Sequence, residues 1–340
     1  MSSRLVPSVL VALAAGVAIL AGLVAFSRPP ERPRPDAGTG LDFAAAIATN
    51  LSTLPDRQDY RARDATVLSY RRYAAANGSA ARTIILVHGS GWHGMQFHAL
   101  ATALAANGLG TVIVPDLRGH GPDPVRRGDV DHIGQLEEDL FDLIAHLKNG
   151  GEPGRLVLGG HSSGGGLVVR FAGGRYGGEA DAFLLLAPFL KYDAPTTRPA
   201  SGGWARPATG RIVALGLINT LGITAFNHLP VISFAMPRSV LDGPLGNTAT
   251  TRYTYRMNVS FAPRPDYTGD LARLDRPFLL LAGDRDEAFI ADKYESTIGP
   301  HTSSGSYRIL AGVNHLGLVD AEATVNAIEA WLTERVPAGS

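Results

Sequence analysis

The sequence has no cysteine and no excess of charge of either sign. The absence of cysteine excludes disulfide bonds, a cysteine nucleophile and thiolate metal sites, and it leaves the redox compartment open. Lys+Arg and Asp+Glu both total 31, so there is no broad basic surface and no nucleic-acid partner is expected. Charged residues make up 18% of the chain and hydrophobic residues 45%, which predicts a folded domain with a sizeable core.

Motifs for metal ions and nucleotide cofactors are also missing. No stretch matches the P-loop pattern G-x-x-x-x-G-K-[ST] or the dinucleotide-binding fingerprint. His88, His93 and His98 are spaced five residues apart, unlike the H-E-x-x-H pattern that brings two histidines to one helix face. We therefore expect neither a metal ion nor a cofactor.

The N-terminal region (residues 1–40) is expected to be a membrane anchor followed by a tether. Residues 5–26 carry no charge over 22 positions, which is enough for a helix to span a hydrocarbon core of about 30 Å. Because Val24-Ala25-Phe26 is a poor signal-peptidase site, we expect an uncleaved single-pass anchor. A removed signal peptide, giving a secreted or periplasmic protein, is the alternative. Arginines on both sides of the span leave its orientation open, and the four prolines of residues 27–40 predict an extended tether.

From residue 41 to residue 340 the pattern is that of an α/β domain. Short, continuous apolar runs, typical of strands buried on both faces, alternate with stretches of helical periodicity. This alternation predicts right-handed βαβ units and a mostly parallel, doubly wound sheet. The expected strands lie at 83–87, 111–114, 156–158, 183–186, 278–282 and 307–310, with a strand or hairpin at 65–74, and the expected helices at 41–51, 97–106, 131–148 and 321–335.

The alternation is interrupted between about residues 188 and 265, a stretch rich in Gly, Pro and Thr. Within it, residues 212–235 are apolar without clear strand signals, so we expect an inserted, largely helical cap. The dense apolar residues of this cap predict that one of its sides faces a cavity or lipid.

The strongest chemical signal is the stretch Gly160-His161-Ser162-Ser163-Gly164, which matches G-x-S-x-G between an apolar strand and the apolar start of a helix. Such a turn lifts the serine Oγ above the sheet edge and points the backbone N–H behind it at the same space. Glycine is needed at both ends because side chains there would collide with the neighbouring strand and helix. We choose Ser162 as the nucleophile over its neighbour Ser163.

Partners for this serine follow the last two expected strands. One strand ends in Gly283-Asp284-Arg285-Asp286-Glu287 and the other leads to Asn314-His315. Parallel strands share one carboxyl edge, so Ser162, an acid and His315 are expected to converge there in the order Ser, Asp, His. His315 would accept the serine proton and return it to the leaving group, while a carboxylate would fix the tautomer of the imidazole.

These motifs together resemble the α/β-hydrolase superfamily, and within it the monoacylglycerol lipase and lysophospholipase-like serine esterases. The resemblance covers roughly residues 60–336 and rests on five stretches, namely 88–91 (HGSG), 116–121 (DLRGHG), 160–164 (GHSSG), 283–286 (GDRD) and 314–315 (NH). It implies an oxyanion hole formed by the backbone N–H groups of Ser90 and Ser163. It also implies that Asp286 is the acid, with Asp284 as the alternative, that residues 116–121 have a structural role, and that the cap is a lid.

The predicted function is hydrolysis of carboxylic esters through an acyl-enzyme, with a medium- or long-chain acyl lipid as the expected substrate. A serine peptidase or amidase of the same fold and a non-catalytic, membrane-tethered binding protein are the alternatives. Trp92 and His120 border the expected cleft, and His161 lies inside the serine turn. Trp92 and His161 are the candidate substrate contacts, although packing explains Trp92 and His120 at least as well and explains His161 better. The sequence does not indicate an oligomeric state.

Overall fold

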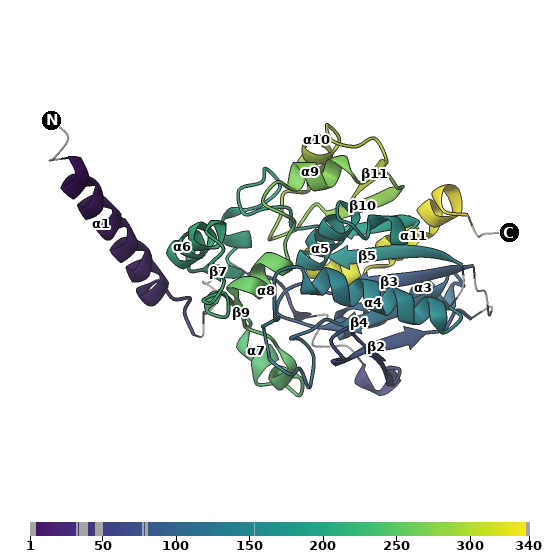
Figure 1. Ribbon diagram of the computed structural model, residues 1–340. Coiled ribbons are helices and arrows are strands. Elements are labelled where there is room, and N and C mark those ends of the chain that lie inside the picture. Colours follow the sequence, from purple (N-terminus) through teal and green to yellow (C-terminus); the bar gives the residue numbers. More distant parts are fainter. Residues whose placement is uncertain are drawn as a thin grey trace.

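An eight-stranded, mostly parallel sheet forms the centre of the computed structural model (Figure 1). The structure describes residues 5–31, 33, 40–44, 50–76, 78, 81–152 and 154–337. The strand order is β1-β2-β4-β3-β5-β6-β10-β11; β2 pairs antiparallel with β1 and β4, and every other neighbouring pair is parallel. The strands are β1 (Arg57–Arg61), β2 (Val67–Tyr73), β3 (Arg82–Val87), β4 (Thr111–Asp116), β5 (Arg155–His161), β6 (Ala182–Leu186), β10 (Phe278–Gly283) and β11 (Gly305–Leu310).

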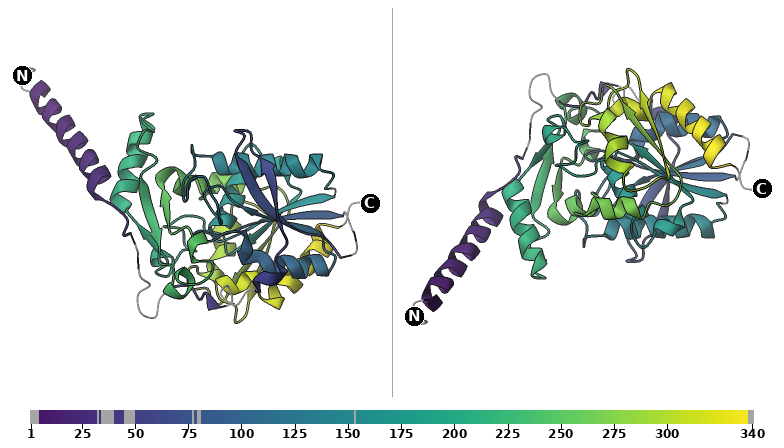
Figure 2. Two further views of the ribbon diagram at one scale, coloured as in Figure 1. Left: turned by 90° about the horizontal axis from the view of Figure 1, so that it is seen from below. Right: turned by 90° about the horizontal axis from the view of Figure 1, so that it is seen from above.

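The central strands are buried on both faces, which confirms the predicted mostly parallel sheet. Every residue of β3, β4, β6 and β10 is buried, as the continuous apolar runs predict. Helices α3 and α11 cover one face, and α4 and α5 cover the other (Figure 2). The edge strand β1 was not predicted, because it is polar and buries only Tyr60.

The α/β domain outside the 188–265 segment contains the helices α3 (His98–Ala106), α4 (Gln135–Asn149), α5 (Ser163–Ala172), α9 (Tyr267–Ala272), α10 (Tyr294–Ile298) and α11 (Glu322–Arg335). Along the whole domain, 3₁₀ turns lie at Leu51–Thr53, Gly94–Phe97, Gly177–Glu179, Pro199–Ser201, Gly246–Thr248, Ala291–Lys293 and Leu316–Val319. Helices α3, α4 and α11 lie close to the predicted ranges, and α5 is the helix expected after Ser162. The short helices α9 and α10 were not predicted. The helix expected at 41–51 is wrong at its start, since residues 41–43 are not helical. Its middle, residues 45–49, lies outside the described residues.

The segment between 188 and 265 contains a small sheet that the sequence analysis missed. Strands β7 (Ala205–Pro207), β8 (Pro230–Phe234) and β9 (Arg252–Thr254) form a three-stranded antiparallel sheet beside helices α6 (Thr209–Thr220), α7 (Arg238–Leu241) and α8 (Tyr255–Ser260). The expectation of a largely helical cap is therefore corrected to a mixed one. A five-residue apolar strand such as β8 cannot be told from a buried helix by periodicity alone.

The predicted N-terminal helix forms as α1 (Leu5–Phe26) and projects from the body beside α6 (Figures 1 and 2). Its C-terminal end is tied to the start of α6: Ser27 Oγ accepts the backbone N–H of Arg211 (3.2 Å), and the Arg211 guanidinium donates to the carbonyl of Ala25 (3.3 Å). A cation beside the last carbonyls of a helix is a favourable arrangement. Within the part of the chain that the structure describes, no helix combines the length and hydropathy needed to cross a bilayer.

Candidate active site

The turn at Ser162 joins β5 to α5 and holds the serine in a strained backbone conformation. Ser162 has φ 57° and ψ −121°, a region that residues with a Cβ rarely adopt. Its N–H donates to the carbonyl of Leu186 (2.9 Å), and its carbonyl accepts from the N–H groups of Gly166 (3.1 Å) and Phe189 (2.9 Å). These three hydrogen bonds fix the serine at the carboxyl edge of the sheet.

The glycines on both sides of the turn are required by close backbone approach. A Cβ on Gly164 would lie 2.2 Å from the carbonyl oxygen of Val87, and a Cβ on Gly160 would lie 2.4 Å from the backbone of Gly164. Both distances are far below van der Waals contact, so a side chain at Gly164 would push the turn away from the end of β3 and one at Gly160 would push the start of α5 away from β5.

His315 and Asp286 meet beyond the ends of β11 and β10. His315 Nδ1 donates to Asp286 Oδ2 (2.8 Å), and Asp286 Oδ1 accepts from the backbone N–H groups of Ala288 and Phe289 (2.8 Å each). Burial raises the pKa of Asp286, but attraction to His315 and these hydrogen bonds outweigh it and bring the pKa below its usual value. An ionised Asp286 therefore accepts the Nδ1–H of His315 and fixes the orientation of the ring.

The two neighbouring acids have other partners. Asp284 Oδ1 accepts the backbone N–H of Gly312 (2.7 Å), so Asp286 is the carboxylate that meets the His315 ring. Glu287 Oε2 accepts the backbone N–H of His315 (2.9 Å) and so anchors the loop that carries it. No local pattern singles out Glu287, whose only signal in the sequence is its position next to Asp286.

Ser90 and Ser163, the predicted oxyanion-hole residues, flank Ser162 from two elements. Ser163 is the first residue of α5, so its N–H has no acceptor within the helix. Ser90 lies after β3 in a loop held by the 188–265 segment: Trp204 Nε1 donates to Ser90 Oγ (3.2 Å), and the N–H of Gly91 donates to the hydroxyl of Tyr253 (2.9 Å). No local pattern marks Trp204 or Tyr253, because each meets this loop only through the tertiary fold.

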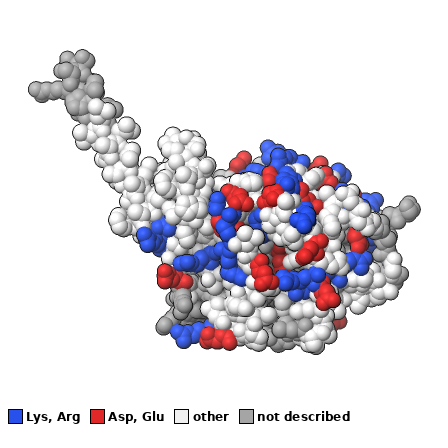
Figure 3. Space-filling view, turned by 60° about the horizontal axis from the view of Figure 1, so that its bottom comes forward, with Lys and Arg blue, Asp and Glu red and all other residues white. Residues whose placement is uncertain are grey.

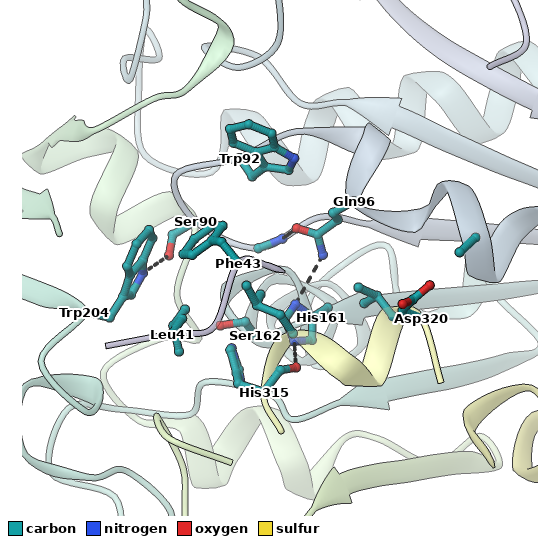
Figure 4. A pocket seen from close by; sticks show the side chains of 14 residues that line it. Leu41, Phe43, Ser90, Trp92, Gln96, His161, Ser162, Trp204, His315 and Asp320 are labelled. Atoms are coloured by element: carbon teal, nitrogen blue, oxygen red, sulfur yellow. Dashed lines mark hydrogen bonds between the residues drawn. The ribbon is translucent and has the colours of Figure 1, made fainter. Parts of the chain in front are cut away.

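Gln96 and His161 connect the loop that carries Ser90 to the loop that carries His315 (Figure 4). The first of these, residues 88–91, is here called the oxyanion loop after its predicted role. The N–H of Gly89 donates to Gln96 Oε1 (3.2 Å), Gln96 Nε2 donates to His161 Nδ1 (3.2 Å), and His161 Nε2 donates to the carbonyl of His315 (3.0 Å). Burial, followed by repulsion from His315, lowers the pKa of His161 to about 3, so the ring is neutral. Both of its nitrogens are occupied, which leaves His161 in the pocket wall without a polar atom to offer a substrate.

Ser162 and His315 open onto one pocket of about 40 Å³ (Figure 4). Trp92 lies in its wall, stacked on His93 with ring centroids 5.0 Å apart. Leu41 and Phe43, from the very start of the α/β domain, line the same pocket and were not predicted to reach it. The full lining is Leu41, Phe43, Gly89, Ser90, Trp92, Gln96, Ala99, His161, Ser162, Trp204, His315, Leu316, Val319 and Asp320.

Two more buried histidines, His88 and His120, pack behind the pocket. Burial lowers the pKa of both, so both rings are neutral. His88 Nδ1 donates to the carbonyl of Gly89 (2.8 Å) and its Nε2 accepts the N–H of Leu117 (3.2 Å), while burial lowers its pKa to about 4. His120 donates from Nδ1 to the carbonyl of Arg118 (3.0 Å) and accepts from the Tyr253 hydroxyl (2.6 Å). Among the described residues, no cluster of three or more His, Asp or Glu side chains is arranged to hold a metal ion.

The sequence was compared with known protein families and with characterised relatives. The profile of the family described as serine aminopeptidase, S33, matches residues 78–235, which include the oxyanion loop and the Ser162 turn. A monoacylglycerol lipase of Mycolicibacterium smegmatis is 33% identical over 105 residues, which are 31% of this chain and 37% of that protein. The match thus spans little more than a third of that relative's length.

Solved structures agree over a much larger part of the chain. A soluble variant of the monoglyceride lipase of Saccharomyces cerevisiae superimposes with a TM-score of 0.61 at 17% identity, covering 86% of this chain and 98% of that one. A bacterial membrane phospholipase A gives a TM-score of 0.57 at 19% identity and covers 99% of this chain and 100% of that one.

The sheet, the strained serine turn and the solved structures together show that the chain has the α/β-hydrolase fold. In sequence it is similar to a monoacylglycerol lipase, as its motifs predict.

Proposed function

We propose that this chain is a serine hydrolase that cleaves carboxylic esters through an acyl-enzyme. The observation that carries the proposal is the pairing of His315 with Asp286 (2.8 Å) in the pocket that also contains the strained Ser162. Asp286 holds the Nδ1 proton of His315, which leaves Nε2 able to act as a base. A serine hydroxyl needs such a base because it is a weak nucleophile at neutral pH.

In the proposed reaction, Ser162 Oγ attacks the ester carbonyl carbon while its proton passes to His315 Nε2. The tetrahedral intermediate collapses when the bond to the alkoxy group breaks and His315 gives the proton to that leaving group. Water then attacks the acyl-enzyme, again losing its proton to His315, and the carboxylic acid leaves as Ser162 regains a proton. The backbone N–H groups of Ser90 and Ser163 would stabilise the oxyanion, at about 3–4 kcal/mol for each donor.

We propose acyl-lipid esters as the substrate class. The pocket walls are largely apolar, with Leu41, Phe43, Trp92 and Trp204 around Ser162, and such walls suit an acyl chain. The matched Mycolicibacterium smegmatis relative is a monoacylglycerol lipase, which is consistent with this class.

The proposal includes a location at a lipid surface, reached through α1 and the neighbouring side of α6. The tip of the α6 region exposes a group of large apolar side chains, and the described part of α1 exposes another; the visible face of both carries no charged side chain (Figure 3). An exposed apolar surface of this kind commonly marks a membrane or protein contact. The exposed residues are Leu10, Val11, Leu13, Val17, Ile19 and Phe26 on α1 and Val213, Leu217, Leu221, Ile223 and Phe226 around α6.

Co-sedimentation of the full chain with phosphatidylcholine vesicles tests this location. The double variant Leu221→Glu/Phe226→Glu should bind vesicles more weakly than the wild type, because it puts two charges on the exposed apolar surface. Tyr192→Glu is the matched control, because Tyr192 is also exposed but lies at the start of the 188–265 segment, before α6 in the sequence. Equal binding by all three proteins would refute the contribution of α6.

The catalytic proposal is tested with a fluorophosphonate probe and a series of p-nitrophenyl esters. The wild type should be labelled at Ser162 and should hydrolyse the esters, whereas Ser162→Ala should lose both properties and keep a melting temperature within a few degrees of the wild type. The neighbouring hydroxyl provides the control, since Ser163→Ala keeps its backbone N–H and should still be labelled. Ester hydrolysis by Ser162→Ala at the wild-type rate would disprove the assignment, and an inert wild type would favour a binding protein.

A serine aminopeptidase is the second candidate, favoured by the description of the matching family and by Asp320 in the pocket lining. A carboxylate near the serine could pair with the amino terminus of a peptide. Aminoacyl-anilides, assayed beside the esters, distinguish the two activities. A higher kcat/KM for an anilide than for every ester, lost in Asp320→Asn, would replace the esterase proposal with the peptidase.

A further inference from the structure

A short segment at the start of the α/β domain lines the pocket of the candidate active site. Residues 40–43, here called the strap, are anchored where the N–H of Gly40 donates to the carbonyl of Gly202 (3.0 Å). Leu41 and Phe43 point inward and line the pocket, while Asp42 between them is exposed. The strap therefore presents its two apolar side chains to the same space as Ser162 and His315 (Figure 4).

Phe43 is the more deeply placed of the two side chains. It is 6% exposed, and its ring lies 5.5 Å from that of Trp204. Trp204 in turn stacks on Phe234 at 5.4 Å and donates its indole N–H to Ser90 Oγ. Phe43 thus packs on the aromatic side chain that holds the oxyanion loop, although Trp204 lies 114 positions after Ser90 in the sequence.

The size of the pocket conflicts with a long acyl substrate while the strap is in place. Its volume is about 40 Å³, whereas sites for drug-sized ligands usually measure roughly 300–1,000 Å³. The rest of the wall comes from the sheet edge, from helix α3 and the loop after β11, and from Trp204 of the 188–265 segment. The strap lies before every strand of the sheet, and the N–H of Gly40 joins it to the carbonyl of Gly202 in the 188–265 segment.

We infer that Leu41 and Phe43 form the size-determining wall of the substrate pocket and set the acyl-chain length that the enzyme accepts. The inference rests on the proposed ester hydrolysis. A shorter side chain at position 43 opens space beside Trp204, and each additional methylene that the substrate buries there strengthens binding by about fourfold. A larger side chain at the same position closes that space.

The test compares kcat/KM for p-nitrophenyl butyrate and p-nitrophenyl decanoate in the full chain. Phe43→Ala should raise the decanoate-to-butyrate ratio at least tenfold over the wild type, and Phe43→Trp should lower it. Leu41→Ala provides a second enlargement should the Phe43 variant fold poorly, and it should move the ratio in the same direction.

Phe141→Ala is the matched control. It removes an equal ring from a half-buried site on α4, where Phe141 packs on Tyr176 with centroids 4.6 Å apart, outside the pocket. Its ratio should equal that of the wild type. A purely structural role for the strap would lower both rates and leave the ratio unchanged in Phe43→Ala and Leu41→Ala, and that result would overturn the inference alone. A wild type that neither reacts with a fluorophosphonate nor hydrolyses butyrate would overturn the proposed function and the inference with it.

Discussion

Replacing Asp286 with Asn tests the proposed catalytic geometry at its most constrained point. The Asn side chain has one acceptor oxygen and one NH2 group, and the structure decides where each must go. In the native protein, Oδ1 accepts two backbone N–H groups, from Ala288 and Phe289, and Oδ2 accepts one proton from His315. Placing the Asn oxygen at the two backbone donors preserves two hydrogen bonds, whereas the flipped orientation preserves one.

The preferred orientation turns the NH2 group toward His315. It can then be satisfied only if Nδ1 becomes an acceptor, which moves the ring proton to Nε2 and removes the base from Ser162. The flipped orientation would leave two buried backbone donors without an acceptor, at a cost of about 1–3 kcal/mol each. The tautomer therefore changes, and we expect kcat to fall roughly 10³–10⁴-fold, equivalent to about 4–5.5 kcal/mol of transition-state stabilisation.

Steady-state hydrolysis of p-nitrophenyl butyrate at pH 7.5 measures the effect, with circular dichroism to check folding. Asp284→Asn is the matched control, because Asp284 accepts only the N–H of Gly312 and an Asn oxygen can do the same. It should retain activity within a few-fold of the wild type. A loss of less than tenfold in Asp286→Asn, or an equal loss in Asp284→Asn, would refute the reasoning.

Two further predictions concern the buried polar groups around the site. Gln96→Ala removes the amide that joins the oxyanion loop to His161, so kcat should fall by about 10–100-fold with KM changed far less; a kcat equal to the wild type would rule out this positioning role. Burial lowers the pKa of His88 to about 4 and that of His161 to about 3, whereas a histidine in the unfolded chain has a pKa of about 6.5. Below about pH 6.5 the unfolded chain therefore binds protons that the folded protein does not. The contribution of the two rings to stability is complete above about pH 6.5 and is lost as the pH falls toward 4. The melting temperature should be level between pH 7 and 8.5 and should drop by pH 5, by an amount equivalent to about 1 kcal/mol per histidine and pH unit; an unchanged melting temperature at pH 5 would contradict neutral rings in the folded protein.

The local sequence determined the central sheet and the site's main positions. Buried strands such as β3 and β10 are short apolar runs. A run of this kind predicts a buried strand from its own residues alone. The turn at Ser162 is largely local, because its strained φ and the close approach of Gly160 to Gly164 are set within five residues, whereas Gly164 also approaches Val87 at the end of β3. His315 follows from the rule that parallel strands end at one edge, which needs only the order of elements.

Only the tertiary structure decided between equivalent residues and brought distant ones together. Asp284 and Asp286 are chemically identical in sequence, and the choice depends on which carboxylate meets the His315 ring and the backbone N–H groups at 288 and 289. The small sheet β7-β8-β9 has strands of three to five residues, whose pairing comes from long-range contacts that local periodicity does not report. The position of Phe43 and Trp204 beside Ser162 also depends on long-range contacts, because the pocket wall is assembled from segments that are far apart in the chain. The local sequence around an apolar side chain does not indicate which cavity that side chain will line.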